Sequence, residues 1–157
     1  MIAIGDKIVY PMHGAGVIEA IEEKEVLGEV MSYYVLHIPH GNMQVLVPVS
    51  SSEQVGLRSI IDGGFVDRVY EVLSGESTEM DPNWNRRNRE NLDKMKTGDV
   101  CMVAEVVRNL TRVDRVKKLS MGEKKLLGNA RHILISELTL VEGKSEETVS
   151  DMIDKAI

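Results

Sequence analysis

The chain has 157 residues and a formal net charge of −6 at pH 7, and 43% of its residues are hydrophobic and 28% charged. This composition is typical of one globular domain or two small ones, and it excludes a fibrous or disordered chain. Because no apolar run approaches the roughly 20 residues of a membrane helix, and residues 1–6 lack the pattern of a signal peptide, we expect a cytoplasmic protein with no membrane partner.

Residues 1–53 have the pattern of a small β module. Runs rich in Val and Ile are expected to form strands at 7–10, 16–27, 32–38 and 43–49. Gly, Pro and Asn stand between these runs, and no helical period is present. The pattern predicts a small, strongly bent antiparallel sheet or barrel, which is better suited to presenting a surface than to enclosing a ligand.

From about residue 58 the apolar period becomes helical. A polar, acidic linker at 74–82 separates a first helical segment from the helices that follow. The sequence therefore predicts an α+β protein, with a β domain at 1–53 and an all-α domain at 54–157.

Start signals locate the later helices. A helix is expected over 84–96, and Asp99 is a candidate N-cap for the next one. Ser120 and Glu123 form a Ser-x-x-Glu capping box ahead of a long amphipathic helix, and 145–157 has one apolar face for a closing helix.

Positive charge is concentrated in one stretch of this acidic chain. Residues 83–136 carry 13 Lys and Arg against 6 Asp and Glu. Trp84, the only tryptophan, precedes Arg86, Arg87 and Arg89 in the first turns of a predicted helix. Cations at a helix N-terminus oppose the helix dipole, so their placement costs stability unless an anion binds there. The pattern fits a solvated helix face or a surface that touches nucleic acid, and the aromatic residue favours the second.

Further cations follow on the next two predicted helices. Arg108, Arg112 and Arg115 recur at i, i+4 and i+7, and we expect them to extend the positive surface. Lys124 and Lys125 lie in the first turn of the next predicted helix, where they form another cation cluster.

Motifs for catalysis or metal binding are missing from the sequence. The four histidines, His13, His37, His40 and His132, lack the close spacing of metal ligands, and the single cysteine permits no cysteine cluster and no internal disulfide. There is no phosphate-binding loop and no nucleophile elbow. We therefore expect no cofactor, no metal and no small-molecule ligand, and we do not expect an enzyme.

Several segments together resemble one known family. They are Gly5-Asp6-x-Ile8-Val9-Tyr10-Pro11-x-His13-Gly14-x-Gly16, Val45-Leu46-Val47-Pro48, Asn83-Trp84-x-Arg86-Arg87, Val103-Ala104-Glu105-Val106-Val107-Arg108-x-Leu110 and Leu119-Ser120-x-Gly122-Glu123-Lys124. The chain is similar to the CarD/CdnL family of bacterial transcription regulators, and the likeness runs through nearly the whole chain in the same order.

The resemblance implies an N-terminal Tudor-like β-barrel that docks on the β subunit of bacterial RNA polymerase. It also implies a helical domain whose tryptophan enters the DNA minor groove at the upstream edge of the promoter bubble, without reading sequence, and so stabilises the open complex. Carried onto this chain, the DNA-contacting residues are Trp84, Arg86, Arg87, Arg89, Arg112, Lys124 and Lys125.

The polymerase-binding positions implied by the resemblance are Lys24, Gln44 and Leu46. Some family members have arginines at the positions of Lys24 and Leu46. Here Lys24 keeps the positive charge but cannot form the bidentate hydrogen bonds of a guanidinium group, and Leu46 carries no charge. Docking is then expected to depend more on the strand edge and on apolar contacts.

Three alternatives stay open from the residues alone. The chain could be a protein-only adaptor of the transcription machinery, whose basic helices do not touch DNA. It could also be an RNA-associated binder that stacks bases on Tyr33 or Tyr34. Finally, Trp84 could be a core residue that packs on Leu92 and Met95.

Overall fold

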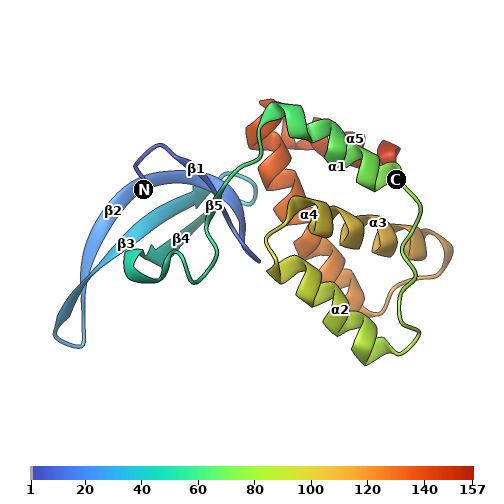
Figure 1. Ribbon diagram of the computed structural model, residues 1–157, viewed down its shortest axis with the longest axis horizontal. Helices are drawn as coiled ribbons and strands as arrows, with labels where there is room; N and C mark the ends of the chain where they lie inside the picture. The colour runs from blue at the N-terminus through green and yellow to red at the C-terminus, as the bar shows by residue number, and fades with distance from the viewer. Residues whose placement is uncertain (1) are drawn as a thin grey trace.

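The computed structural model describes residues 2–157 and has a sheet in its N-terminal part and five α-helices in its C-terminal part (Figure 1). The antiparallel sheet has the order β4-β3-β2-β1-β5. Its strands are β1 (Lys7–Tyr10), β2 (Gly14–Val26), β3 (Glu29–Ile38), β4 (Met43–Pro48) and β5 (Arg58–Ser59).

The sheet bends around a small apolar core. Its buried residues are Ile8, Ile18, Tyr34, Leu36, Ile38 and Val47. Along β3, Tyr34, Leu36 and Ile38 alternate with residues of the opposite face, which is the period that a pleated strand requires. The predicted strands are confirmed, with β3 beginning at Glu29 rather than at residue 32.

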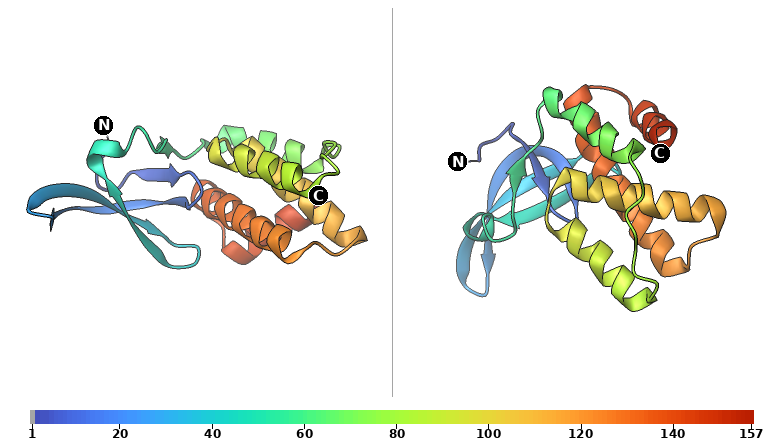
Figure 2. Two further views of the ribbon diagram at one scale, coloured as in Figure 1. Left: turned by 90° about the horizontal axis from the view of Figure 1, so that it is seen from below. Right: turned by 45° about the vertical axis from the view of Figure 1, so that its right-hand side comes forward.

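The reason for the earlier start of β3 is the turn before it. Leu27 and Gly28 both have positive φ, 52° and 80°, as a two-residue type I′ hairpin turn requires. Because this turn follows the natural twist of the strands, pairing continues to its very end, where Val26 lies opposite Glu29. The β2–β3 hairpin therefore projects as a long ribbon (Figures 1 and 2).

The C-terminal part is a bundle with one apolar core. Its helices are α1 (Val66–Ser74), α2 (Trp84–Lys96), α3 (Val100–Val116), α4 (Met121–Glu142) and α5 (Glu146–Ala156). Short 3-10 helices at Val49–Ser51 and Gly63–Phe65 lie in the connection from the sheet. The apolar faces of all five helices meet in a cluster that includes Leu73, Met95, Leu110, Leu134 and Ile153.

The helix boundaries follow the caps that the sequence offers. Asn83, Asp99, Ser120 and Ser145 each accept a hydrogen bond from a backbone N–H in the first turn of α2, α3, α4 and α5. The predicted α+β fold class is confirmed. The domain boundary after residue 53 stays a prediction, and β5 continues the sheet to Ser59 by pairing with β1.

The two parts are joined by polar contacts to α4. Arg58 of β5 forms a bidentate ion pair with Glu137, both N···O distances being 2.8 Å, and Glu137 is buried. Ser136 Oγ accepts a hydrogen bond from the backbone N–H of Ala15 in β2 at 2.8 Å. These contacts attach the sheet to the second half of α4 (Figure 1). Within residues 2–157, no helix is long and apolar enough to cross a membrane.

Candidate nucleic-acid interface

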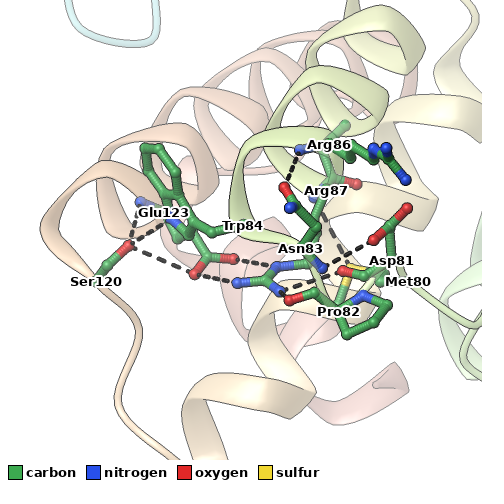
Figure 3. Close-up of polar contacts among 10 residues, drawn as sticks. Met80, Asp81, Pro82, Asn83, Trp84, Arg86, Arg87, Ser120 and Glu123 are labelled. Atoms are coloured by element: carbon green, nitrogen blue, oxygen red, sulfur yellow. Dashed lines mark hydrogen bonds and ion pairs between the residues drawn. The ribbon is translucent and has the colours of Figure 1, made fainter.

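Trp84 is the first residue of α2, and its side chain lies at the surface with 45% of its area exposed. Its Nε1 donates a hydrogen bond to Ser120 Oγ at 3.3 Å (Figure 3). The ring lies against the first turn of α4, since a Cβ atom on Gly122 would be 3.4 Å from the indole Cζ2. Trp84 does not belong to the helical core that contains Met95, so the core-packing alternative is wrong.

Four cations lie near the starts of α2 and α4, the two helices that carry and contact this indole, and they have no partners within the described residues. Arg86, Arg89, Lys124 and Lys125 are all exposed. Within the described residues 2–157, none of their charged groups forms a hydrogen bond or an ion pair. Their charges are therefore available to a ligand, and exposed cations on the same surface as an exposed aromatic ring suit a nucleic acid.

Arg87 differs from its neighbours because its guanidinium group is already engaged. Its Nε and Nη2 donate to the two carboxylate oxygens of Glu123 at 3.0 and 3.1 Å. Its Nη1 donates to the carbonyl oxygens of Asp81 and Pro82 (Figure 3). The hydrogen bonding of the Arg87 guanidinium to the Glu123 carboxylate is the main cause that raises the pKa of Arg87. Arg87 thus joins α2 to α4, and a DNA contact by it stays a prediction that requires these donors to be shared.

The arginines of α3 bind helix ends instead of forming one exposed surface. Arg108 is buried and donates to the carbonyl oxygen of Val72 at 2.9 Å, near the end of α1. Arg112 donates to the carbonyl of Gly75 at 2.6 Å, and Arg115 to the carbonyl of Ile157 at 3.0 Å. The last carbonyls of a helix lack partners within the helix and carry the negative end of its dipole, so they attract guanidinium groups.

The predicted extension of the positive surface along α3 is therefore wrong for Arg108. Burial is the main cause that lowers the pKa of this guanidinium, and Glu105 opposes the shift. Arg112 is half-buried and also bonds Ser77 and Leu73, so a DNA contact by Arg112 stays a prediction that would require it to leave the end of α1.

Two further cations, which were not among the predicted site residues, precede Ser120, the residue that bonds Trp84. Lys117 and Lys118 are exposed in the connection from α3 to α4, directly before Leu119 and Ser120. They line a groove of about 610 Å³ between this connection and residues 80–82, which lead into α2. The sequence contained a signal for these two lysines. The capping box places Ser120 at a helix start, and Lys117 and Lys118 directly precede it, at the positive end of that helix.

The three predicted polymerase-binding residues share one face of the sheet. Lys24 is paired with Met31, Gln44 with His37 and Leu46 with Val35. Directly paired residues project to the same side, and their partners on β3 (Met31, Val35 and His37) are separated by even numbers of residues and alternate with the core residues Tyr34, Leu36 and Ile38. All three side chains therefore lie on the face opposite the small core. Leu46 and Gln44 are on β4, an edge strand, and Lys24 is about 13 Å further along the β2–β3 ribbon.

Three of the histidines that are scattered in the sequence meet where the sheet joins α4. The rings of His40 and His132 stack with centroids 4.8 Å apart. His132 Nε2 lies 3.1 Å from the carbonyl oxygen of His13, and His40 Nδ1 lies 3.1 Å from a carboxylate oxygen of Glu146. Among the described residues, no three His, Cys, Asp or Glu side chains form a group that could hold a metal ion.

Comparison with known proteins gives two regional matches. Residues 2–61 match the CarD-like/TRCF RID domain, and residues 68–154 match the CarD C-terminal domain. The chain belongs to the CarD-like family. This confirms the resemblance found in the sequence, and it identifies a non-enzymatic transcription factor with an RNA polymerase-interacting N-terminal domain.

Two individual proteins are similar to this chain. This CarD-like chain is 45% identical over 150 residues to the putative transcription factor YdeB of Bacillus subtilis (strain 168), covering 95% of this chain and 97% of that protein. A solution NMR structure of the 72-residue N-terminal domain of Myxococcus xanthus CarD is 30% identical, with a TM-score of 0.33, and the match covers 38% of this chain and 79% of that one.

Proposed function

We propose that this CarD-like protein binds the β subunit of bacterial RNA polymerase through its sheet and promoter DNA through its helices. Trp84 enters the minor groove at the upstream edge of the bubble and slows bubble closure. DNA is contacted independently of sequence, since the cations around Trp84 suit phosphates rather than base edges. A cytoplasmic location follows from these partners.

The observation that carries the proposal is the half-exposed indole at the start of α2, on a surface where the first turns of α2 and α4 also present exposed cations that have no partner among residues 2–157. At the edge of a bubble, part of the cost of unstacking a base pair has already been met, and an inserted aromatic ring replaces roughly 1–3 kcal/mol of lost stacking. Since about 1.4 kcal/mol changes an equilibrium constant tenfold, Trp84 accounts for about one order of magnitude in open-complex lifetime.

Charge explains why the protein needs both partners. The chain has a net charge of −6, so its overall field opposes binding to free DNA although the Trp84 region attracts phosphates. Attachment to polymerase raises the effective concentration of promoter DNA to about the millimolar range without a new contact. We therefore expect weak, salt-sensitive binding to free DNA and strong action only within the polymerase complex.

The sheet face with Lys24, Gln44 and Leu46 is the proposed polymerase contact. Leu46 is 38% exposed on an edge strand, which suits strand-edge and apolar contacts. Gln44 donates to Glu19 at 3.2 Å, so part of its polar capacity is used within the sheet. Substituting Leu46 with Glu is expected to weaken polymerase binding without changing Trp84.

A protein-only adaptor is the second candidate function. It is favoured by the observation that Arg87, Arg108, Arg112 and Arg115 have partners within the chain, which reduces the charge left for DNA. Photocrosslinking from position 84 within the polymerase–promoter complex distinguishes the two, because only a DNA-contacting protein gives a crosslink to DNA.

The decisive test is the lifetime of the open complex with native protein and with Trp84→Ala. We expect the substitution to shorten the lifetime about tenfold and to leave polymerase binding unchanged. Phe65→Ala is the matched control, because Phe65 is a similarly exposed aromatic (40%) outside the site. An unchanged lifetime for Trp84→Ala removes the wedge from the mechanism.

A further inference from the structure

Ser120 lies at the centre of the contacts that hold Trp84. Its Oγ accepts a hydrogen bond from the backbone N–H of Glu123 at 3.2 Å, as the N-cap of α4, and another from Trp84 Nε1 at 3.3 Å. The same hydroxyl is 3.4 Å from Glu123 Oε1, to which it donates. One hydroxyl therefore caps α4 and orients the indole that projects from α2 (Figure 3).

Glu123 links this cap to the start of α2. Its carboxylate is buried and receives two hydrogen bonds from Arg87, whose Nη1 donates to the carbonyls of Asp81 and Pro82. Those two residues form the approach to α2. The contacts fix the first turn of α2 against the first turn of α4, so the base from which Trp84 projects is held as well as the ring itself.

Gly122 provides the space in which the indole ring of Trp84 lies. A Cβ atom at this position would lie 3.4 Å from Trp84 Cζ2, so an alanine would just touch the ring and a larger side chain would displace it. The ring therefore has a polar contact at its nitrogen, and its benzene edge faces Gly122, where there is no room for a large side chain. Two contacts of different kinds restrict a side chain more than either alone.

We infer that Ser120 and Glu123 are positioning residues for the Trp84 wedge. The inference rests on the proposed function of Trp84. An unsupported indole at a helix terminus occupies several rotamers, and fixing one of them on DNA costs conformational entropy. Contacts that select the inserting orientation in advance remove this cost, so they stabilise the DNA complex without touching DNA.

Trp84 fluorescence tests positioning directly, because the chain has no other tryptophan. Ser120→Gly removes the hydroxyl while keeping a residue that is tolerated at N-caps, and Ser120→Ala removes hydroxyl and cap together. Both are expected to give faster local anisotropy decay and stronger acrylamide quenching, and Ser120→Thr to restore native behaviour. Ser145→Ala is the matched control, because Ser145 caps α5 through Thr148 at 3.1 Å without contacting Trp84.

The functional readout is open-complex lifetime with the full-length chain and RNA polymerase. Ser120→Gly is expected to shorten it by roughly two- to tenfold, the range that one net hydrogen bond supplies, with unchanged polymerase affinity. Combined with Trp84→Ala, Ser120→Gly is expected to add no further loss, because the group that it positions is absent. Glu123→Gln is also expected to shorten the open-complex lifetime and to speed the anisotropy decay of Trp84, as Ser120→Gly does.

Three outcomes overturn the inference in distinguishable ways. Native anisotropy and quenching in Ser120→Gly and Ser120→Ala would overturn positioning alone, while Trp84→Ala still shortened the lifetime. An unchanged lifetime in Trp84→Ala would overturn the proposed function and this inference with it. An additive loss in the double variant would also overturn positioning, since Ser120 would then act independently of Trp84.

Discussion

Two sets of arginines on neighbouring helices have opposite surroundings. In α3, Arg108, Arg112 and Arg115 point to the C-terminal ends of α1 and α5 and donate to their carbonyls. In α2, Arg86 and Arg89 stand at the helix N-terminus, where the local dipole repels them. The first set gains stability from its position and the second does not. A cation is therefore a better candidate for ligand binding where its own helix disfavours it.

The largest effect in this comparison is expected for Arg108. Arg108→Met leaves the carbonyl of Val72 and the hydroxyl of Thr78 without this donor in a buried site, so we expect a loss of about 3 kcal/mol in the free energy of unfolding, measured with urea. Arg89→Met is the control and should stay within about 0.5 kcal/mol of native. Similar stabilities for the two variants would contradict the division between the two sets.

Arg87 is the intermediate case, since it lies on α2 but has internal partners. Arg87→Ala leaves the buried carboxylate of Glu123 without its two guanidinium donors, and we expect a loss of about 2 kcal/mol in the free energy of unfolding. Arg86→Ala is the adjacent control with no expected loss. If Arg87→Ala kept native stability but weakened DNA binding, Arg87 would belong with Arg86 and Arg89.

Removing the free cations is expected to change DNA binding and leave stability unchanged. If each contacts one phosphate, the double variant Arg86→Ala/Arg89→Ala should reduce the slope of log K against log salt by about 1.8, measured in the polymerase–promoter complex. Lys144→Ala/Lys155→Ala removes the same charge from the α4–α5 connection and α5 and serves as the control. Equal slopes for the two double variants would show that only net charge matters.

The smallest effect concerns a third group of basic side chains, the histidines between sheet and helices. Burial, with the neighbouring His40, lowers the pKa of His132. The unfolded chain then takes up a proton on this histidine near its ordinary pKa of about 6.5, whereas the folded chain does not. The free energy of unfolding therefore decreases as the pH falls below about 6.5. Unfolding measured from pH 7.5 to 5.5 should show a smaller decline in His132→Gln than in native protein. His37→Gln, at a histidine on the exposed sheet face, is the comparison variant.

Local signals predicted the elements well. Asp99 and Ser120 each cap the helix that they were expected to start, and α2 spans the expected residues 84–96. Caps and periods act over a few neighbouring residues, so a single sequence contains them completely. The exposure of Trp84 agreed with the expectation drawn from its cationic neighbours.

Partners distant in sequence could not be predicted in the same way. A capping box predicts that the carboxylate of Glu123 accepts a hydrogen bond from the backbone N–H of Ser120. In the structure this carboxylate instead bonds Arg87, which is 36 residues away in sequence. The spacing of Arg108 and Arg112 describes one face of α3 but not the ends of α1 that this face meets. Such contacts depend on how helices cross, which is decided by packing of the whole core.

Helix α4 also sets the distance between the contact with Trp84 at its start and the contact with the sheet in its second half. Its start touches the indole through Ser120, and Ser136 and Glu137 hold the sheet more than four turns later. With a rise of about 1.5 Å per residue, the stretch from Ser120 to Ser136 sets a spacing of about 24 Å. One inserted residue would lengthen it by only about 1.5 Å but turn one end against the other by about 100°. Insertions in this helix therefore misdirect the tryptophan by rotation before they misplace it by distance.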